Sequence, residues 1–369
     1  MPKKSSGKKV SIILIHYNQM EYIYIAIDSV LNQTYKNIEF IIADDASIEI
    51  DTKKIDNYIK EHNKNNFDYK LIVNKKNMGT VKNINNALQY CKGDYLLVFA
   101  ADDCLYNDRV IENYIKSYKK QKKDVSIIFS QCYMMDEKLE KEQSKFIFLE
   151  EAEKFNKLSS KGQFYILVEK CFAAMGACML NLKVLKENSG FNERFKYIED
   201  WSYFLQTTRN GYRMIYVDFN GLLHRDGGIS HTTNMTQLKI DFYKDLILLT
   251  EIYKFPSLNE LSDSVKKQII DNYIEQKAIV EDFNQKNTVE NLKIIPKQHN
   301  YRNKLRTVRN HLLINSVFLI LLIELNQFLN YRYNKIFETI IITILFLLII
   351  YIIITIINII IKIIKNRIK

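Results

Sequence analysis

The sequence predicts an α/β protein with a doubly wound parallel sheet, followed by a helical segment and a C-terminal transmembrane helical hairpin. Two observations predict the sheet. Short apolar, β-branched runs alternate with segments of helical spacing over the first 100 residues, and polar or acidic clusters follow the apolar runs. The hairpin is predicted by an uncharged apolar stretch of 23 residues at 339–361, which as a helix would cross the roughly 30 Å hydrocarbon core of a membrane.

Each element of the sheet has its own local signal. Val10–Ile15 is short, apolar and β-branched, as in a buried parallel strand, and the next segment places Ile23, Ile27 and Leu31 on one helix face. We expect strands at 10–15, 38–43, 69–73 and 95–100, and helices at 22–31, 55–64 and 81–91. Right-handed crossovers bring the carboxyl ends of parallel strands to one edge of the sheet, where ligands bind.

Polar clusters stand at three of these strand ends, at His16–Asn18, Asp44–Asp45 and Asp102–Asp103. Neither G-x-G-x-x-G nor G-x-x-x-x-G-K-[ST] occurs, so carboxylates stand where nucleotide-binding sheets often have a glycine-rich phosphate loop. A carboxylate repels a diphosphate unless a divalent cation lies between them, and Mg²⁺ and Mn²⁺ prefer oxygen ligands. The pattern therefore predicts a Mn²⁺ or Mg²⁺ cofactor.

Each candidate cluster also has a purely structural interpretation. Asp44–Asp45 can cap the following helix, and Asp102–Asp103 can form a solvated turn. Glu199–Asp200 can open a helix, because the helix dipole favours acidic residues in the first turn. A lone histidine is more often structural than a metal ligand, and this applies to His224 and His231.

Six segments between residues 10 and 230 together carry a family resemblance. They are VSIILIHYN (10–18), SVLNQTY (29–35), FIIADDAS (40–47), NKKNMGTVKNINNAL (74–88), KGDYLLVFAADD (92–103) and SGFNERFKYIEDW (189–201). In this order and at these distances they resemble the inverting glycosyltransferases of family 2. The resemblance covers about 60% of the chain and implies the GT-A fold, with a Rossmann-like nucleotide-binding sheet.

The resemblance implies roles for residues that would meet the donor nucleotide. The loop from Ile15 through Tyr17 to Asn18 would line the nucleotide. Asp45 would accept a hydrogen bond from the base, typically uracil, with Asp44 supporting it. Lys82 stands where the family often has an arginine near the phosphates or the ribose.

The resemblance also implies a metal site and a catalytic base. Asp103 is the expected metal ligand, while Asp102 would meet the ribose or assist at the metal; His224 or His231 is a further candidate ligand. Asp200 corresponds to the catalytic base, and Glu199 would contact the acceptor. Inversion needs one base, because the metal neutralises the leaving diphosphate, whereas glycosidases use two carboxyl groups.

Two departures from the family pattern bear on activity. Ala100–Ala101 precedes the two acidic residues, so the first aspartate of the usual motif is missing. Ala46 replaces the usual glycine, and an alanine predicts an ordinary backbone φ there. The alternative to an active enzyme is therefore a catalytically weakened family member that serves as a membrane scaffold in a polysaccharide assembly complex.

The basic residues are concentrated at the C-terminus. The formal net charge is +11, and the last 69 residues, with ten basic and two acidic side chains, carry +8 of it. A nearly neutral remainder argues against a nucleic-acid partner. Basic clusters at 302–309 and 362–369 flank two apolar segments at 312–329 and 337–361, which places both outer ends in the cytosol by the positive-inside rule. Because Glu324 interrupts the first segment, it can instead be an interfacial helix.

The expected organisation is a basic tail, a GT-A domain, a helical extension, a membrane segment and a basic cytoplasmic tail, at 1–9, 10–234, 235–310, 311–362 and 363–369. The expected function is transfer of a single sugar from a nucleotide-sugar, a UDP-sugar by the family pattern, to a hydroxyl of a lipid-linked or polysaccharide acceptor. The reaction is expected at the cytoplasmic face of the cell membrane. Five cysteines without a C-x-x-C pair fit this reducing compartment.

Overall fold

The structure is a computed structural model that describes residues 7–171, 173–227 and 235–293. The chain divides into two compact units, Met1–Thr288 and Val289–Lys369, and the description below concerns the first. The predicted membrane segments at 312–329 and 337–361 lie outside the described residues. Among the helices that are described, none combines the length and the apolar character that crossing a membrane requires.

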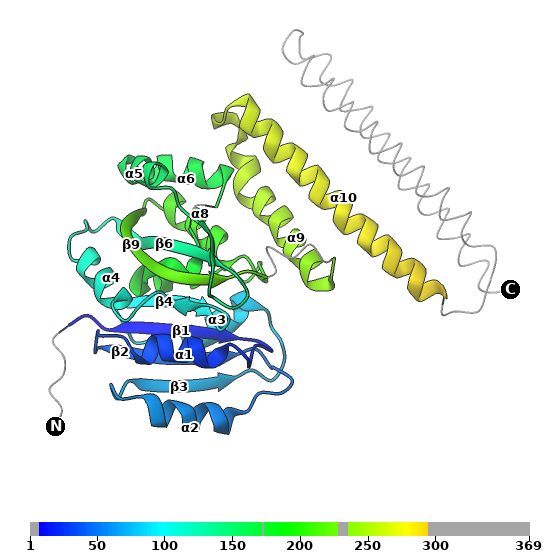
Figure 1. Cartoon of the computed structure of the whole chain (residues 1–369). Coiled ribbons are helices and arrows are strands. Elements are labelled where there is room, and N and C mark those ends of the chain that lie inside the picture. Colours follow the sequence, from blue (N-terminus) through cyan, green and yellow to red (C-terminus); the bar gives the residue numbers. More distant parts are fainter. Residues whose placement is uncertain (1–6, 172, 228–234, 294–369) are drawn as a thin grey trace, which may run out of the picture. The chain divides into compact units, whose positions relative to one another are not determined.

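The first hundred residues form the alternating strands and helices that the sequence predicts, with boundaries within three residues (Figure 1). They are β1 (Val10–His16), α1 (Ile23–Leu31), β2 (Ile38–Asp44), α2 (Thr52–His62), β3 (Asp68–Val73), α3 (Thr80–Leu88) and β4 (Tyr95–Ala100). These four strands are parallel in the order β3-β2-β1-β4, with β1 paired to both β2 and β4. The predicted parallel α/β sheet is therefore confirmed for this half.

The second half extends the sheet in a way that the sequence does not predict. It contains β5 (Cys104–Leu105), α4 (Val110–Tyr118), β6 (Val125–Met135), β7 (Glu142–Lys145), α5 (Leu149–Lys157), α6 (Ser160–Glu169), β8 (Cys178–Asn181), α7 (Leu182–Glu187), α8 (Glu199–Arg209) and β9 (Arg213–Arg225). The order continues β4-β8-β6-β9-β5, with β7 beside β6. The sheet is thus mixed rather than wholly parallel, because β8 runs antiparallel to both neighbours. Since β9 is parallel to β6, its carboxyl end reaches the same edge as that of β4.

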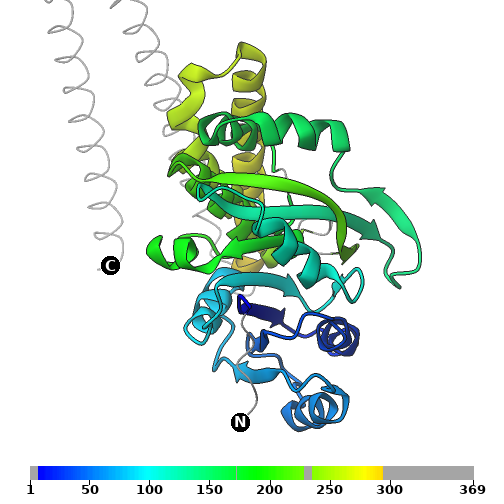
Figure 2. The ribbon, with the colours of Figure 1, turned by 90° about the vertical axis from the view of Figure 1, so that its left-hand side faces the viewer.

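Helices cover both faces of the sheet, and each face has its own core. Along β1, Ile12 and Leu14 pack with α1, α2 and α4, while the intervening Ile13 belongs to the same cluster as α3, α6 and α8. This alternation follows from the period of two in a strand. Figure 2 shows α1 and α2 on one side of the strands and α3 on the other. Because both faces are covered, a ligand reaches the sheet at its edge.

Two helices that the sequence predicts at 238–253 and 265–283 are present after β9. α9 (Gln237–Leu249) continues through a π-helical turn (Thr250–Lys254) and a short 3₁₀ helix (Phe255–Glu260) into α10 (Asp263–Lys293). Leu249 and Tyr253 are buried in the same core as α6 and α8. The segment therefore packs on the second half of the sheet and, as far as Thr288, belongs to the same compact unit.

Candidate functional site

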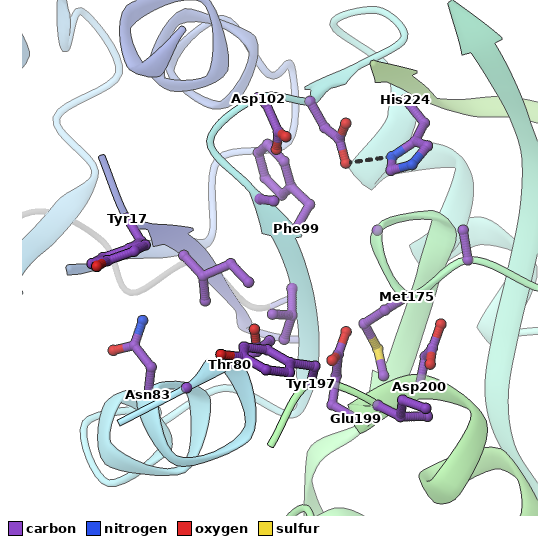
Figure 3. A pocket seen from close by; sticks show the side chains of 18 of the residues that line it. Tyr17, Thr80, Asn83, Phe99, Asp102, Met175, Tyr197, Glu199, Asp200 and His224 are labelled. Atoms are coloured by element: carbon purple, nitrogen blue, oxygen red, sulfur yellow. Dashed lines mark hydrogen bonds and ion pairs between the residues drawn. The ribbon is translucent and has the colours of Figure 1, made fainter. Parts of the chain in front are cut away.

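A cavity of about 650 Å³ opens at the carboxyl edge of the sheet (Figure 3). Its walls come from the ends of β1, β4 and β9 and from the starts of α3, α8 and α9. Most residues that the sequence singles out line it, namely Ile15, Tyr17, Asp45, Asp102, Asp103, Glu199, Asp200 and His224. Its size is ordinary for a small-molecule site. Asn18, Asp44 and Lys82 do not line it, and His231 lies outside the described residues.

The ends of β1 and β2 are tied together by a buried network around Asp44. Asp44 Oδ1 lies 2.7 Å from Nδ1 of His16, and its side chain also bonds the hydroxyl and backbone N–H of Ser47. Burial alone would raise the pKa of Asp44, but the hydrogen bonds from His16 and Ser47 outweigh it and hold the pKa below its usual value. Asn18 joins by donating its N–H to Ser47. Asp44 and Asn18 thus shape the loops behind the cavity.

The turn after β2 contains one difference from the sequence-based expectation. Ala46 has a φ of 63°, in the left-handed region, although an ordinary φ was predicted for an alanine. The prediction is wrong because the Ser47 contacts with Asp44 fold the chain back tightly at this residue. The alanine therefore carries the strain that a glycine would avoid, about 1 kcal/mol.

Asp45 faces the cavity and also holds the start of α3. Its carboxylate accepts the backbone N–H groups of Met78 and Gly79 at 2.8–3.0 Å and an N–H of the Asn74 side chain at 3.0 Å. Gly79, the N-cap of α3, has no side chain with which to cap the helix. The structural interpretation was that Asp45 caps the following helix. Asp45 instead accepts N–H groups at the start of α3, and it also borders the cavity.

α3 presents other residues to the cavity than the predicted Lys82. Lys82 is exposed and does not line the cavity. A helix turns about 100° per residue, so Lys82 points away when Thr80 and Asn83 face inward (Figure 3). Asn83 is fixed there by donating to the carbonyl oxygen of Ala43 and accepting from Asn74.

The acidic pair after β4 is held by the end of β9. Asp103 is buried, and its two oxygens accept from the backbone N–H of Arg225 at 3.0 Å and meet Nδ1 of His224 at 2.9 Å. The Arg225 guanidinium donates to the carbonyl oxygens of Asp102 and Glu137. Arg225 thus organises the acidic loop. In the sequence it is signalled only by its place next to the candidate ligand His224.

The charges in this pair interact strongly. Burial, followed by the like charge of Asp103, raises the pKa of Asp102 to about 6. Burial alone would lower the pKa of His224, but the Asp103 carboxylate outweighs it and raises that pKa above its usual value. Asp102 is therefore the carboxylate of the pair that faces the cavity with its charge incompletely compensated.

The acidic pair fits the divalent cation that the sequence predicts. Within the described residues, no three Asp, Glu, His or Cys side chains form a ready-made metal site. Mg²⁺ and Mn²⁺ nevertheless bind through one or two carboxylates together with substrate phosphates. A cation beside Asp102 would relieve the like-charge contact with Asp103. Each Asp103 oxygen accepts one hydrogen bond and has a second lone pair, so Asp103, the ligand expected from the sequence, can still bind a cation together with Asp102.

Glu199 and Asp200 form the first turn of α8 on the opposite side of the cavity (Figure 3). Asp200 Oδ1 accepts the backbone N–H of Trp201 at 2.6 Å. Burial raises the pKa of Asp200 to about 6, opposed by the N–H groups at the helix start. Burial and the neighbouring Asp200 charge raise the pKa of Glu199 well above its usual value. Each of these two neighbouring carboxyl groups therefore holds a proton more readily than an exposed one does.

One wall of the cavity is apolar and comes from a segment without any recognised motif. Leu238, Phe242 and Leu246 of α9 line it at intervals of four residues, together with Met175 and Phe146 from the second half of the sheet domain. The i, i+4, i+8 spacing was readable in the sequence as one face of a helix. That this face meets the cavity depends on how α9 packs.

Comparisons with known proteins agree with this fold. Residues 11–188 match the family described as glycosyl transferase family 2. An uncharacterized glycosyltransferase of Methanocaldococcus jannaschii is 26% identical over 212 residues, or 57% of this chain and 68% of that protein. The UDP-Glc:alpha-D-GlcNAc-diphosphoundecaprenol beta-1,3-glucosyltransferase WfaP of Escherichia coli is 43% identical over 96 residues, or 26% of this chain and 35% of WfaP.

Among solved structures, S. aureus TarS 1–349 in complex with UDP-GlcNAc matches with a TM-score of 0.50 at 19% identity. The match covers 73% of this chain and 72% of that chain, which supports a common fold. Residues 11–188 therefore belong to glycosyl transferase family 2, and the chain is a glycosyltransferase with a GT-A-like fold.

Proposed function

We propose that this glycosyltransferase moves a single sugar from a UDP-sugar to a hydroxyl of a lipid-linked acceptor, with inversion at the anomeric carbon. The relative WfaP is named for a UDP-glucose donor and a diphosphoundecaprenol-linked acceptor, and it shares 43% identity over 96 residues. The apolar stretch at 339–361 and its basic flanks favour an enzyme held at the cytoplasmic face of the cell membrane. Tethering would confine enzyme and lipid acceptor to one surface.

One observation carries the proposal: two acidic centres face each other across a single cavity. Asp102 lies at the end of β4, beside the edge where a nucleotide diphosphate binds in sheets of this type. Asp200 lies at the start of α8 on the other side (Figure 3). The space between them holds the reacting carbon of the sugar, so the acceptor approaches from the side of Asp200, opposite the leaving diphosphate.

Asp200 supplies the base for an inverting displacement. Its Oδ1 is held by the Trp201 N–H, which leaves Oδ2 to take the proton of the acceptor hydroxyl. The acceptor oxygen then forms its bond to the anomeric carbon while the bond from that carbon to the phosphate oxygen breaks, and the nucleoside diphosphate leaves with the electron pair. A base with a pKa of about 6 is largely ionised at pH 7 and still able to accept a proton.

Glu199 has a different task, as the carboxyl group beside the base that contacts the acceptor. Its side chain lines the cavity next to Asp200, so Glu199 orients an acceptor or sugar oxygen there by hydrogen bonding. Burial and the Asp200 charge raise the pKa of Glu199, which disfavours a second negative charge next to the base.

Asp102, supported by Asp103, would hold Mn²⁺ or Mg²⁺ at the donor diphosphate. When bound, the cation neutralises the charge that develops on the leaving group. His224 and Arg225 keep the two carboxyl groups in place through their bonds to Asp103 and to the backbone of Asp102.

The test uses the full-length protein in lipid nanodiscs with a panel of UDP- and GDP-sugars, each with Mn²⁺, Mg²⁺ or EDTA. One donor should raise the melting temperature in the presence of a cation, since a ligand at 100 times its Kd stabilises by about 2.7 kcal/mol. The same donor should then be consumed with a polyprenyl-diphosphate-sugar acceptor. Asp102→Asn should remove the metal-dependent shift, and Asp218→Asn, an exposed carboxylate on β9, should keep it. The proposal fails if no sugar nucleotide stabilises the protein or is consumed with either cation.

A further inference from the structure

We propose that Asp245 of α9 is a positioning residue for catalysis, which holds the backbone before α8 and thereby places Asp200 in the cavity. The inference rests on the proposed function, in which Asp200 is the base. It assigns a task to the helical segment after β9, which carries no motif in the sequence.

The observation is a carboxylate that binds three successive backbone N–H groups. Oδ2 of Asp245 accepts from the N–H of Lys196 at 2.7 Å, of Tyr197 at 2.7 Å and of Ile198 at 3.3 Å. The Asp245 side chain is buried, at 5% exposure. Burial raises the pKa of Asp245, and the same three N–H groups oppose that rise.

These N–H groups lie immediately before the helix that carries Asp200. α8 begins at Glu199, and its N-cap residue, Ile198, has no side chain able to accept a hydrogen bond. The groups at the start of a helix need acceptors from elsewhere. Asp245 supplies one from a different helix, so the direction in which the first turn of α8 projects depends on the position of α9.

The same backbone is also fixed from the donor side. The carbonyl oxygen of Lys196 accepts the N–H of Val81 at the start of α3, whose preceding residues are held by Asp45. Residues 196–198 are thus clamped between α3, which borders the nucleotide side, and α9, which borders the acceptor side. This clamp sets the separation between the nucleotide side and the acceptor side of the cavity, and Asp245 is the α9 residue that binds its backbone.

The decisive variant is Asp245→Ala, measured in the full-length protein. Because a shift of about 1 Å in a reacting group costs on the order of 100-fold, kcat should fall by roughly that factor while the donor Kd changes by less than about threefold. Amide hydrogen exchange at residues 196–198 should become faster in the same variant. Asp245→Asn keeps one acceptor oxygen and should retain kcat within about tenfold of wild type.

A matched control lies one turn earlier on the same helix. Asp241 also contacts residue 196, but it pairs with side chains only among the described contacts, at Lys196 Nζ, Lys244 Nζ and Gln237. Asp241→Asn should therefore leave kcat and the exchange of amides 196–198 unchanged. An equal loss of kcat in both variants would overturn the proposal, as would a wild-type kcat in Asp245→Ala.

If Asp245→Ala does not fold, Asp245→Glu decides. It keeps the charge but moves the acceptor by one methylene group, so kcat should fall well below that of Asp245→Asn with donor affinity preserved. Equal activity of the Glu and Asn variants would overturn the inference. Asp200→Asn, assayed in parallel, separates the two hypotheses: an active Asp200→Asn refutes the proposed base, whereas an inactive one beside a normal Asp245→Ala refutes only the role of Asp245.

Discussion

Replacing the proposed base by its amide, Asp200→Asn, should separate catalysis from stability. The amide keeps an oxygen for the Trp201 N–H, so the first turn of α8 remains in place. It cannot accept the proton of the acceptor hydroxyl, and the loss of a general base lowers kcat by about 10²–10⁴-fold. Donor affinity should remain, because the proposed nucleotide site lies on the opposite side of the cavity.

The magnitude of the stability effect follows from the pKa of Asp200. Burial raises it from 3.8 to about 6 in the folded protein, a difference of about 2 units, or about 3 kcal/mol at 1.36 kcal/mol per unit. Because the folded pKa lies above the unfolded value, this cost is fully present above pH 6 and disappears as the pH falls below 3.8. The Asn variant should therefore be more stable than wild type at pH 8, by at most about 3 kcal/mol, and no more stable near pH 4.

The assay pairs melting curves between pH 4 and 8 with nucleoside diphosphate release at saturating donor. Wild-type kcat should fall as the pH drops through about 6, because Asp200 becomes protonated. Glu61→Gln, an exposed change on α2, serves as the control and should match wild type throughout. A kcat of Asp200→Asn within tenfold of wild type refutes the base, and a stability gain independent of pH refutes the burial cost.

Three further substitutions test the surrounding geometry. Gly79→Ala should reduce both the melting temperature and kcat. Gly79 has a φ of 85°, and a Cβ there would lie 2.5 Å from Cγ of Lys196 and 3.0 Å from its carbonyl oxygen. A wild-type melting temperature and kcat in this variant would contradict the clamp at residues 196–198. Ala46→Gly should stabilise the protein by up to about 1 kcal/mol by removing left-handed strain, and a measured loss of stability in urea unfolding would reject that strain. Lys254→Met should raise the melting temperature at pH 7. Burial lowers the pKa of Lys254 from 10.5 to about 8, so below pH 8 the buried charge destabilises the folded protein by about 3 kcal/mol. The contact of Lys254 with the Trp201 ring at 4.0 Å offsets part of this cost. The gain in melting temperature should shrink as the pH rises from 8 to 10.5. A gain that stays constant with pH would show that it comes from packing and not from the buried charge.

The first four strands and their helices could be read from the sequence because their signals are local. Apolar β-branched runs and helical spacing depend only on nearby residues, and the boundaries came within three residues of the structure. The later strands were not predicted from the sequence, because β6 and β9 pair through residues some 90 positions apart. Antiparallel β8 between β4 and β6 is likewise a property of the whole sheet.

The residues of the candidate site likewise include some that the sequence predicts and others whose placement depends on packing. Asp102, Asp103, Glu199 and Asp200 could be proposed from strand ends and family segments, and the structure places all four around one cavity. Lys82 does not reach it, because the helix phase of α3 turns that position to solvent. The contacts by which β9 holds the Asp103 carboxylate span more than 120 residues, so the sequence does not predict them.

The sequence alone was enough to predict the alternating α/β half, the acidic residues at the strand ends and the family resemblance. Each of these depends on residues that lie close together in the chain or follow one another in a fixed order. Only the tertiary structure decided that Asp200 faces Asp102 across a shared cavity and that α9 closes one wall of it. It also decided that Asp245 holds the backbone before Asp200. The physical reason is that burial, pKa and hydrogen-bond partners depend on packing between distant segments, which local periodicity does not encode.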